Sequence, residues 1–94
     1  MKNTSAGTET FQGERRQQIT ATTNIKAEAG RIRRILVQAG VGAVDVYDDP
    51  AANTNPAWSI AATAVGQIHE LDCPMTFGIR VVMAAAGRLT VIYD

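Results

Sequence analysis

The sequence predicts an all-β domain, and three observations support that fold class. Val, Ile and Thr recur in short runs, and such β-branched residues are favoured in strands. Gly, Pro, Asn and Asp punctuate these runs, as turn residues do. No segment shows the apolar spacing of an amphipathic helix. We therefore predict about seven short antiparallel strands in a β-sandwich or jelly-roll-like module, preceded by an extended N-terminal arm.

The bulk composition limits the alternatives. The chain has 94 residues, of which 46% are hydrophobic, and this fits one folded domain. Nine basic and nine acidic side chains give a formal net charge of zero, which argues against a dedicated nucleic-acid binder. The single cysteine, Cys73, excludes an intramolecular disulfide. Because neither a membrane helix nor a secretory signal is apparent, we expect a protein made in a cytoplasm and not bound to a membrane.

Residues 1–16 form a polar arm ahead of the predicted domain at 17–94. Phe11 is the only large apolar residue of this arm apart from Met1, and its small polar residues cannot offset the entropy of ordering. Two interpretations stay open: a disordered chain end, or an arm that becomes ordered on a partner. In the second, Phe11 is the apolar anchor, and charges such as those of Arg15 and Arg16 set the register.

The first predicted strand covers residues 17–29. Ile19, Thr23 and Ile25 share one parity, as expected of a half-buried strand. A helix is the weaker interpretation, because the threonines of this segment lose rotamer freedom in a helix. A turn at Gly30 would follow.

The second predicted strand covers residues 31–39, and its alternation fails at one point. The apolar residues change parity around Arg33 and Arg34, which indicates either that both faces are covered or that a β-bulge lies there; we favour the bulge. The Gly-Val-Gly segment at 40–42 predicts a hairpin. A third strand at 43–47 would then return beside the second.

The remainder of the chain continues the same pattern. Residues 48–56 are rich in Asp, Asn and Pro, and this composition predicts a loop. Further strands are predicted at 57–64, 68–73, 79–84 and 88–93.

No residues support a catalytic, metal or cofactor site. His69 is the one histidine, and along a strand it would lie about 13 Å from Cys73, too far to share a metal or a proton. The Asp and Asn residues between 45 and 55 lack calcium-loop spacing and are typical of turns. We therefore expect no enzymatic activity, no cofactor, no metal and no small-molecule substrate.

Basic residues are the strongest candidates for a binding surface. Arg31 and Arg33 would project from the same face of one strand. They lack the interleaved aromatic residues that nucleic-acid binding uses for stacking, so we expect salt bridges to acidic groups of a partner protein. The candidate partner-binding residues are Phe11, Arg15, Arg16, Arg31 and Arg33.

Four segments of the chain resemble small structural proteins of tailed bacteriophages. They are ITATTNIKAEAGRIRRILVQAG, AVDVYDDPAANTNP, a Trp-Ser-Ile strand and the closing GIRVVMAAAGRLTVIYD. These segments are similar to capsid decoration, or cement, proteins, which bind the outside of the head shell. The resemblance covers about residues 20–94, and it brings no catalytic residues.

The resemblance implies a non-enzymatic virion structural protein, assembled in the host cytoplasm and located on the capsid surface. Such a protein binds the major capsid protein, as a homo-oligomer, and stabilises the head because it adds its binding energy to the assembled lattice. One alternative is a phage tail or fibre-base module that binds another tail protein or a host glycan. Another is a small soluble bacterial β domain with an unrelated binding role.

Overall fold

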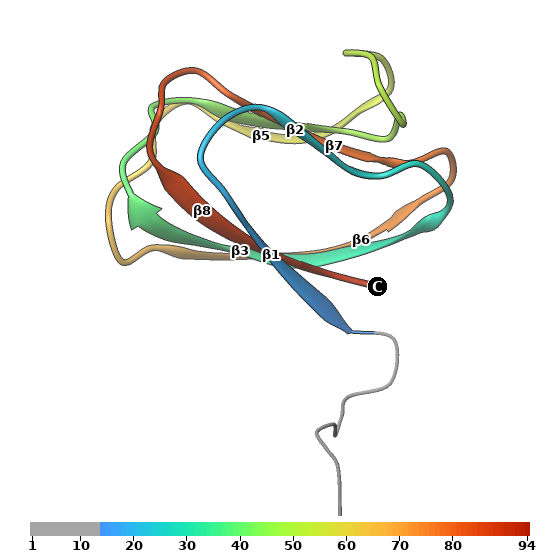
Figure 1. Ribbon diagram of the computed structural model, residues 1–94, viewed down its shortest axis with the longest axis horizontal. Helices are drawn as coiled ribbons and strands as arrows, with labels where there is room; N and C mark the ends of the chain where they lie inside the picture. Colours follow the sequence, from blue (N-terminus) through green and yellow to red (C-terminus); the bar gives the residue numbers. More distant parts are fainter. Residues whose placement is uncertain (1–13) are drawn as a thin grey trace, which may run out of the picture.

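The computed structural model describes residues 14–94, in which the chain forms two four-stranded antiparallel sheets and no helix (Figure 1). The first sheet has the order β1 (Arg15–Ile19), β8 (Arg88–Tyr93), β3 (Gly30–Ala39) and β6 (Ile68–Met75). The second has the order β2 (Thr23–Lys26), β7 (Ile79–Met83), β4 (Val44–Tyr47) and β5 (Pro56–Ile60). The predicted all-β fold class is confirmed. With no helix in it, this part of the chain offers none that could cross a membrane.

The strand pairing makes this sandwich a jelly roll. β1 pairs with β8, β2 with β7, β3 with β6 and β4 with β5, so the two halves of the chain run side by side as one long folded hairpin. Pairing of β3 with β8 and of β4 with β7 then completes each sheet. Two four-stranded sheets connected in this way are the jelly-roll architecture.

The single strand predicted at 17–29 is wrong. β1 ends at Ile19 and β2 begins at Thr23, and the two strands lie in opposite sheets. Threonines make the turn between them: the Thr22 hydroxyl accepts a hydrogen bond from the backbone of Met83, and the Thr23 hydroxyl donates one to the backbone of Ala21. Because alternation continues through this turn, the pattern could not show the break. Residues 14–94 therefore contain eight strands where about seven were predicted.

The hairpin predicted at 40–42 is also wrong. β3 and β4 belong to different sheets, and this segment carries the chain from one sheet to the other. Val41 is completely buried within it, and Gly42 adopts a φ of 74°, which favours glycine. A Gly-rich turn fits either connection, so composition alone did not distinguish them.

The bulge predicted in the second strand is confirmed. The register of β3 shifts between Ile32 and Arg34 against both of its neighbours. This shift changes the parity of the strand, so that Ile32, Ile35 and Val37 are all buried. The boundaries of two other strands differ from the prediction by more than one residue, because β5 stops at Ile60 and β6 continues to Met75.

The core lies between the two sheets and consists of aliphatic residues, two methionines and one tyrosine. Its buried members are Ile19, Ile32, Ile35, Val37, Val41, Val44, Val46, Met75, Ile79, Val81, Met83, Leu89, Val91 and Tyr93. Full burial of each large aliphatic side chain stabilises the fold by about 1.5–3 kcal/mol before the entropy of ordering is subtracted.

The connections gather at the two ends of the sandwich. We call one the Asp48 end; it contains residues 27–29, 48–55, 76–78 and Asp94, and β1 begins there. We call the other the Val41 end; it contains residues 20–22, 40–43, 61–67 and 84–87.

Candidate partner-binding surface

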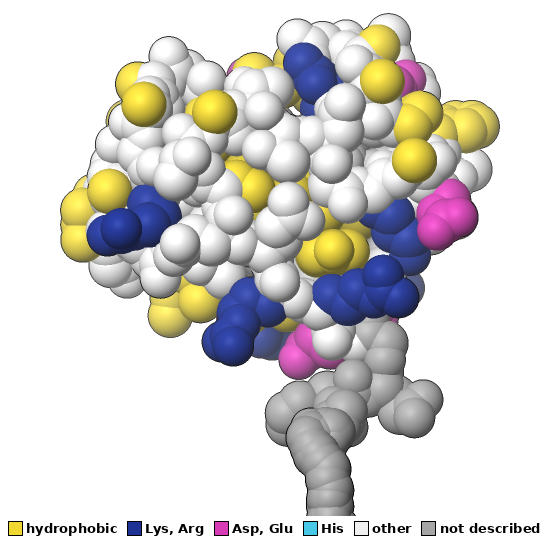
Figure 2. All heavy atoms as spheres, in the orientation of Figure 1, with side chains coloured by type: hydrophobic (Ala, Val, Ile, Leu, Met, Phe, Trp, Pro, Cys, Tyr) yellow, Lys and Arg dark blue, Asp and Glu magenta, His cyan; other side chains and the backbone are white. Residues whose placement is uncertain are grey.

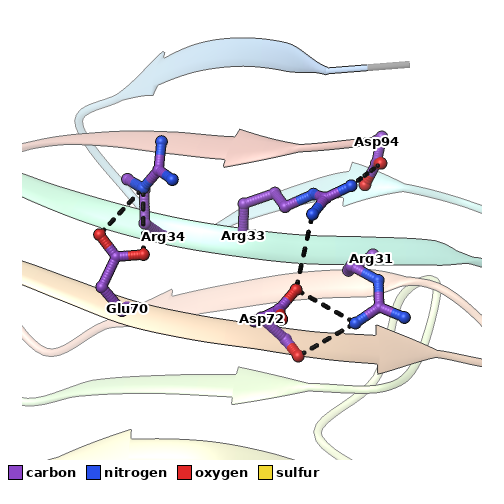
Figure 3. Close-up of polar contacts among 6 residues, drawn as sticks. All are labelled: Arg31, Arg33, Arg34, Glu70, Asp72 and Asp94. Carbon is purple, nitrogen blue, oxygen red and sulfur yellow. Dashed lines mark hydrogen bonds and ion pairs between the residues drawn. The ribbon is translucent and has the colours of Figure 1, made fainter. Parts of the chain in front are cut away.

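Two of the predicted binding residues, Arg31 and Arg33, reach the same carboxylate (Figure 3). Their Nη1 atoms lie 3.1 Å and 3.6 Å from Oδ1 of Asp72, and Nη2 of Arg33 lies 2.8 Å from Oδ2 of Asp94. Both residues therefore share one face of β3, as expected. The ion pairs that the sequence assigned to a partner are, however, formed within the chain.

The β3 bulge produces this arrangement. Arg33 is the extra residue of β3 against β8. On the β6 side it stands opposite both Leu71 and Asp72, and Asp72 has a φ of 48° that aspartate tolerates. The hydrogen bond from Arg33 lowers the pKa of the Asp94 carboxyl and raises the pKa of the Arg33 guanidinium, so both groups stay charged. Arg33 Nε and Asp94 Oδ1 are buried without a hydrogen-bond partner among residues 14–94.

Arg15 and Arg16 begin β1 instead of ending an arm. They lie opposite Tyr93 and Ile92 of β8 and are exposed. Together with Glu14 they line a shallow hollow of about 320 Å³ over Ile92. Within residues 14–94 neither arginine forms an ion pair, so both can meet acidic groups of a partner. Phe11, the remaining predicted residue, lies outside the described residues.

A second feature of the Asp48 end was not predicted. The Asp48 carboxylate accepts backbone hydrogen bonds from Thr76 at 2.9 Å, Phe77 at 2.7 Å and Gly78 at 3.3 Å. Burial opposes the charge, but these three bonds outweigh it and hold the pKa of Asp48 below its usual value. A Cβ on Gly78 would come within 2.7 Å of the Pro50 backbone, so only glycine lets the two loops approach this closely.

We call the Asp48 carboxylate and its three backbone hydrogen bonds the clamp. It holds the β6–β7 turn, at whose tip Phe77 lies with 56% of its surface exposed. Two other large apolar residues are comparably exposed, Val65 at 69% and Ile68 at 62%, and they lie at or beside the Val41 end. Aromatic residues held in one conformation are frequent anchors of protein interfaces. The aromatic residue in a short Thr-Phe-Gly turn after Pro74 was visible in the sequence as a candidate contact residue. The carboxylate that holds this turn belongs to Asp48, 29 residues away along the chain, and local pattern could not reveal it.

The predicted basic residues and Phe77 belong to the same end of the molecule. Arg31 is paired with Asp94 through two backbone hydrogen bonds, and β1 starts beside them. Figure 2 shows basic and acidic side chains together along the lower part of the domain, near the start of the described chain. The candidate surface therefore combines one apolar anchor with free and paired charges.

The one histidine joins no metal-binding cluster in the part of the chain that the structure describes. His69 packs against Trp58 with ring centroids 5.3 Å apart, at the edge of the core. Residues 14–94 contain no cluster of three His, Cys, Asp or Glu side chains that could hold a metal ion.

Comparison with known proteins gives no relative. The chain matches no protein-family model, no curated protein and no solved structure. The fold and the surface described above are thus the observations from which a function can be argued.

Proposed function

We propose that this protein is a virion structural protein that binds the outer surface of a tailed-phage head, with the major capsid protein as its partner. The observation that carries the proposal is the exposed Phe77 on a turn held by the Asp48 carboxylate. The Asp48 end then faces the capsid. The phage-like sequence segments and the jelly-roll architecture, which occurs in capsid proteins, support the same assignment as analogies.

The clamp favours binding because it reduces the entropy that association costs. Thr76, Phe77 and Gly78 are each tied to one carboxylate, so the turn needs little ordering on contact. Burial of one aromatic side chain in a partner pocket contributes about 2–3 kcal/mol. Repeated over many lattice sites, even a modest contact stabilises the assembled head, since the protein binds the lattice and not the dispersed subunits.

The charges around Phe77 complete the surface. Arg15 and Arg16 provide two cationic groups that can pair with acidic groups of the capsid protein. β1 begins at the Asp48 end. The hypothesis that Phe11 is a second anchor concerns residues outside those that the structure describes.

Co-sedimentation with expanded heads tests this proposal. Phe77→Ala should weaken binding by about tenfold or more, because anchors of this type dominate interface energies. Val65→Ala is the control, since Val65 is also an exposed large apolar residue but lies in the β5–β6 loop at the Val41 end. Circular dichroism should show both variants folded.

Two results would contradict the proposal at different levels. Unchanged binding of Phe77→Ala would show that the Asp48 end does not contact the capsid. Failure of the wild-type protein to bind phage heads would refute the proposed decoration function. Cryo-microscopy showing a few copies at one vertex would instead support the tail or fibre-base alternative.

A further inference from the structure

The four open sheet edges differ in how they are protected. β6 contains Pro74, β5 begins with Pro56, and β2 is short and has a register shift after Asn24. Prolines and bulges at an edge prevent pairing with another strand. β1 has neither, and its five residues pair with β8 without interruption. In the described part of the chain β1 is thus the one edge free of these devices.

The backbone groups that β1 leaves open can be identified. Asp94 and Arg31 exchange two backbone hydrogen bonds of 2.9 Å and 3.1 Å, so Asp94 bonds toward β3. Successive residues of an antiparallel strand bond to opposite sides. Tyr93 therefore bonds toward β1, where its partner is Arg15.

The same alternation along β1 directs the backbone N–H and C=O groups of Arg16 and Gln18 to the open edge. No strand among residues 14–94 covers these groups. Their side chains lie on the outer face of the first sheet beside a hollow of about 320 Å³ that Leu36, Gln38 and Thr90 complete.

We propose that β1 of a second copy of this chain pairs antiparallel with this edge, across a two-fold axis at Gln17. Arg16 then lies opposite Gln18 of the second copy, and the two such pairs exchange about four backbone hydrogen bonds. A two-fold axis at Arg16 would instead place two arginines directly opposite each other, which is unfavourable. The proposed register is self-complementary, as a two-fold interface requires, and it joins both first sheets into one.

Sedimentation equilibrium of the full chain over a concentration series tests the dimer. The mass should rise from the 10.0 kDa of one chain to twice that value, with a dissociation constant in the micromolar range because the interface is small. Gln18→Pro removes an N–H from the open edge while leaving the β1–β8 bonds, and it should weaken the dimer by about tenfold or more. Gln18→Ala is its control and should retain the dimer.

Charge substitutions at the same position test the register. Gln18→Glu should tighten the dimer by roughly threefold to tenfold, because each glutamate faces Arg16 of the other copy, and Gln18→Arg should weaken it. With the axis at Arg16, position 18 would face Glu14, and both effects would reverse. Such a reversal would overturn the proposed register.

Hydrogen exchange distinguishes a second copy from other occupants of the edge. The Arg16 and Gln18 amides should be protected only at concentrations at which the dimer forms. Protection in a monomer would mean that residues of the same chain cover the edge. That result, or a mass of one chain at every concentration, would overturn the proposal.

Discussion

The two ends of this sandwich are held together by different physical forces. At the Asp48 end, a carboxylate holds three backbone N–H groups, and Arg33 is paired with Asp94 at 2.8 Å. At the Val41 end, contacts are neutral: the Thr63 hydroxyl accepts a bond from the Val41 amide and donates one to the Gly42 carbonyl. One end therefore depends on ionisation, whereas the other depends on close packing and backbone hydrogen bonds.

Because of this difference, the Asp48 end is suited to contacting a partner and the Val41 end to holding the two sheets together. Charge-assisted hydrogen bonds can hold an exposed turn in one conformation without burying its side chains, which leaves Phe77 free to contact a partner. The Val41 end buries its central residue completely and is suited to joining the sheets. Each end should therefore respond to its own kind of change.

The largest effect is expected from Gly87→Ala at the Val41 end. A Cβ at this position would lie 2.3 Å from Val41 Cγ1 and 2.8 Å from the Gly40 carbonyl oxygen. Such overpacking should lower the free energy of unfolding by about 3 kcal/mol in urea denaturation. Gly40→Ala is the control, because its Cβ meets only the Thr63 carbonyl at 3.7 Å; a loss of similar size there would refute the packing argument.

Removing the clamp should have the next largest effect. Asp48→Ala leaves three backbone donors without their carboxylate, and we expect a loss of about 2 kcal/mol in the free energy of unfolding. Asp45→Ala is the matched control, since Asp45 forms no side-chain hydrogen bond with residues 14–94 in this structure, and it should change stability by less than about 0.5 kcal/mol. Equal losses would show that the clamp does not hold the turn.

Acid should loosen the Asp48 end first. The folded-state pKa values of Asp48 and Asp94 lie below 3.8, so their contribution is present above the unfolded-state value and is lost as the pH falls through the folded-state values. As the pH falls below about 3.8, amide exchange at residues 76–78 should rise after correction for intrinsic rates. Exchange at the Ala84 and Ala85 amides should not change until global unfolding; simultaneous loss at both ends would contradict the comparison.

The smallest effect is expected for an ion pair that belongs to neither end. Arg34 Nε donates to both oxygens of Glu70 at 3.2 Å and 3.1 Å on the outer face of the first sheet (Figure 3). The Glu70 side chain is 65% exposed, so Glu70→Gln should change the free energy of unfolding by less than about 0.5 kcal/mol. Added salt should reduce the difference from wild type further, whereas a loss above 1 kcal/mol would show that this pair is structural.

The sequence by itself determined the fold class and several of the strands. Alternation placed Ile79, Val81 and Met83 on the buried face of β7, and the parity change at Arg33 located the bulge. These features could be predicted because the two-residue period of a strand is local and is visible within a few residues. The candidate residues Arg31 and Arg33 were likewise placed on one face by local spacing alone.

Only the tertiary structure decided which strands pair and which charges meet. β1 pairs with β8 at the other end of the chain, and the Asp48 carboxylate binds the Phe77 amide 29 residues away. The residues on either side of Gly40 and Gly42 have the same pattern whether the chain forms a hairpin or crosses to the other sheet. That choice depends on which sheet buries Val41 and the faces beside it, and burial is a property of the whole packed domain and not of any one segment.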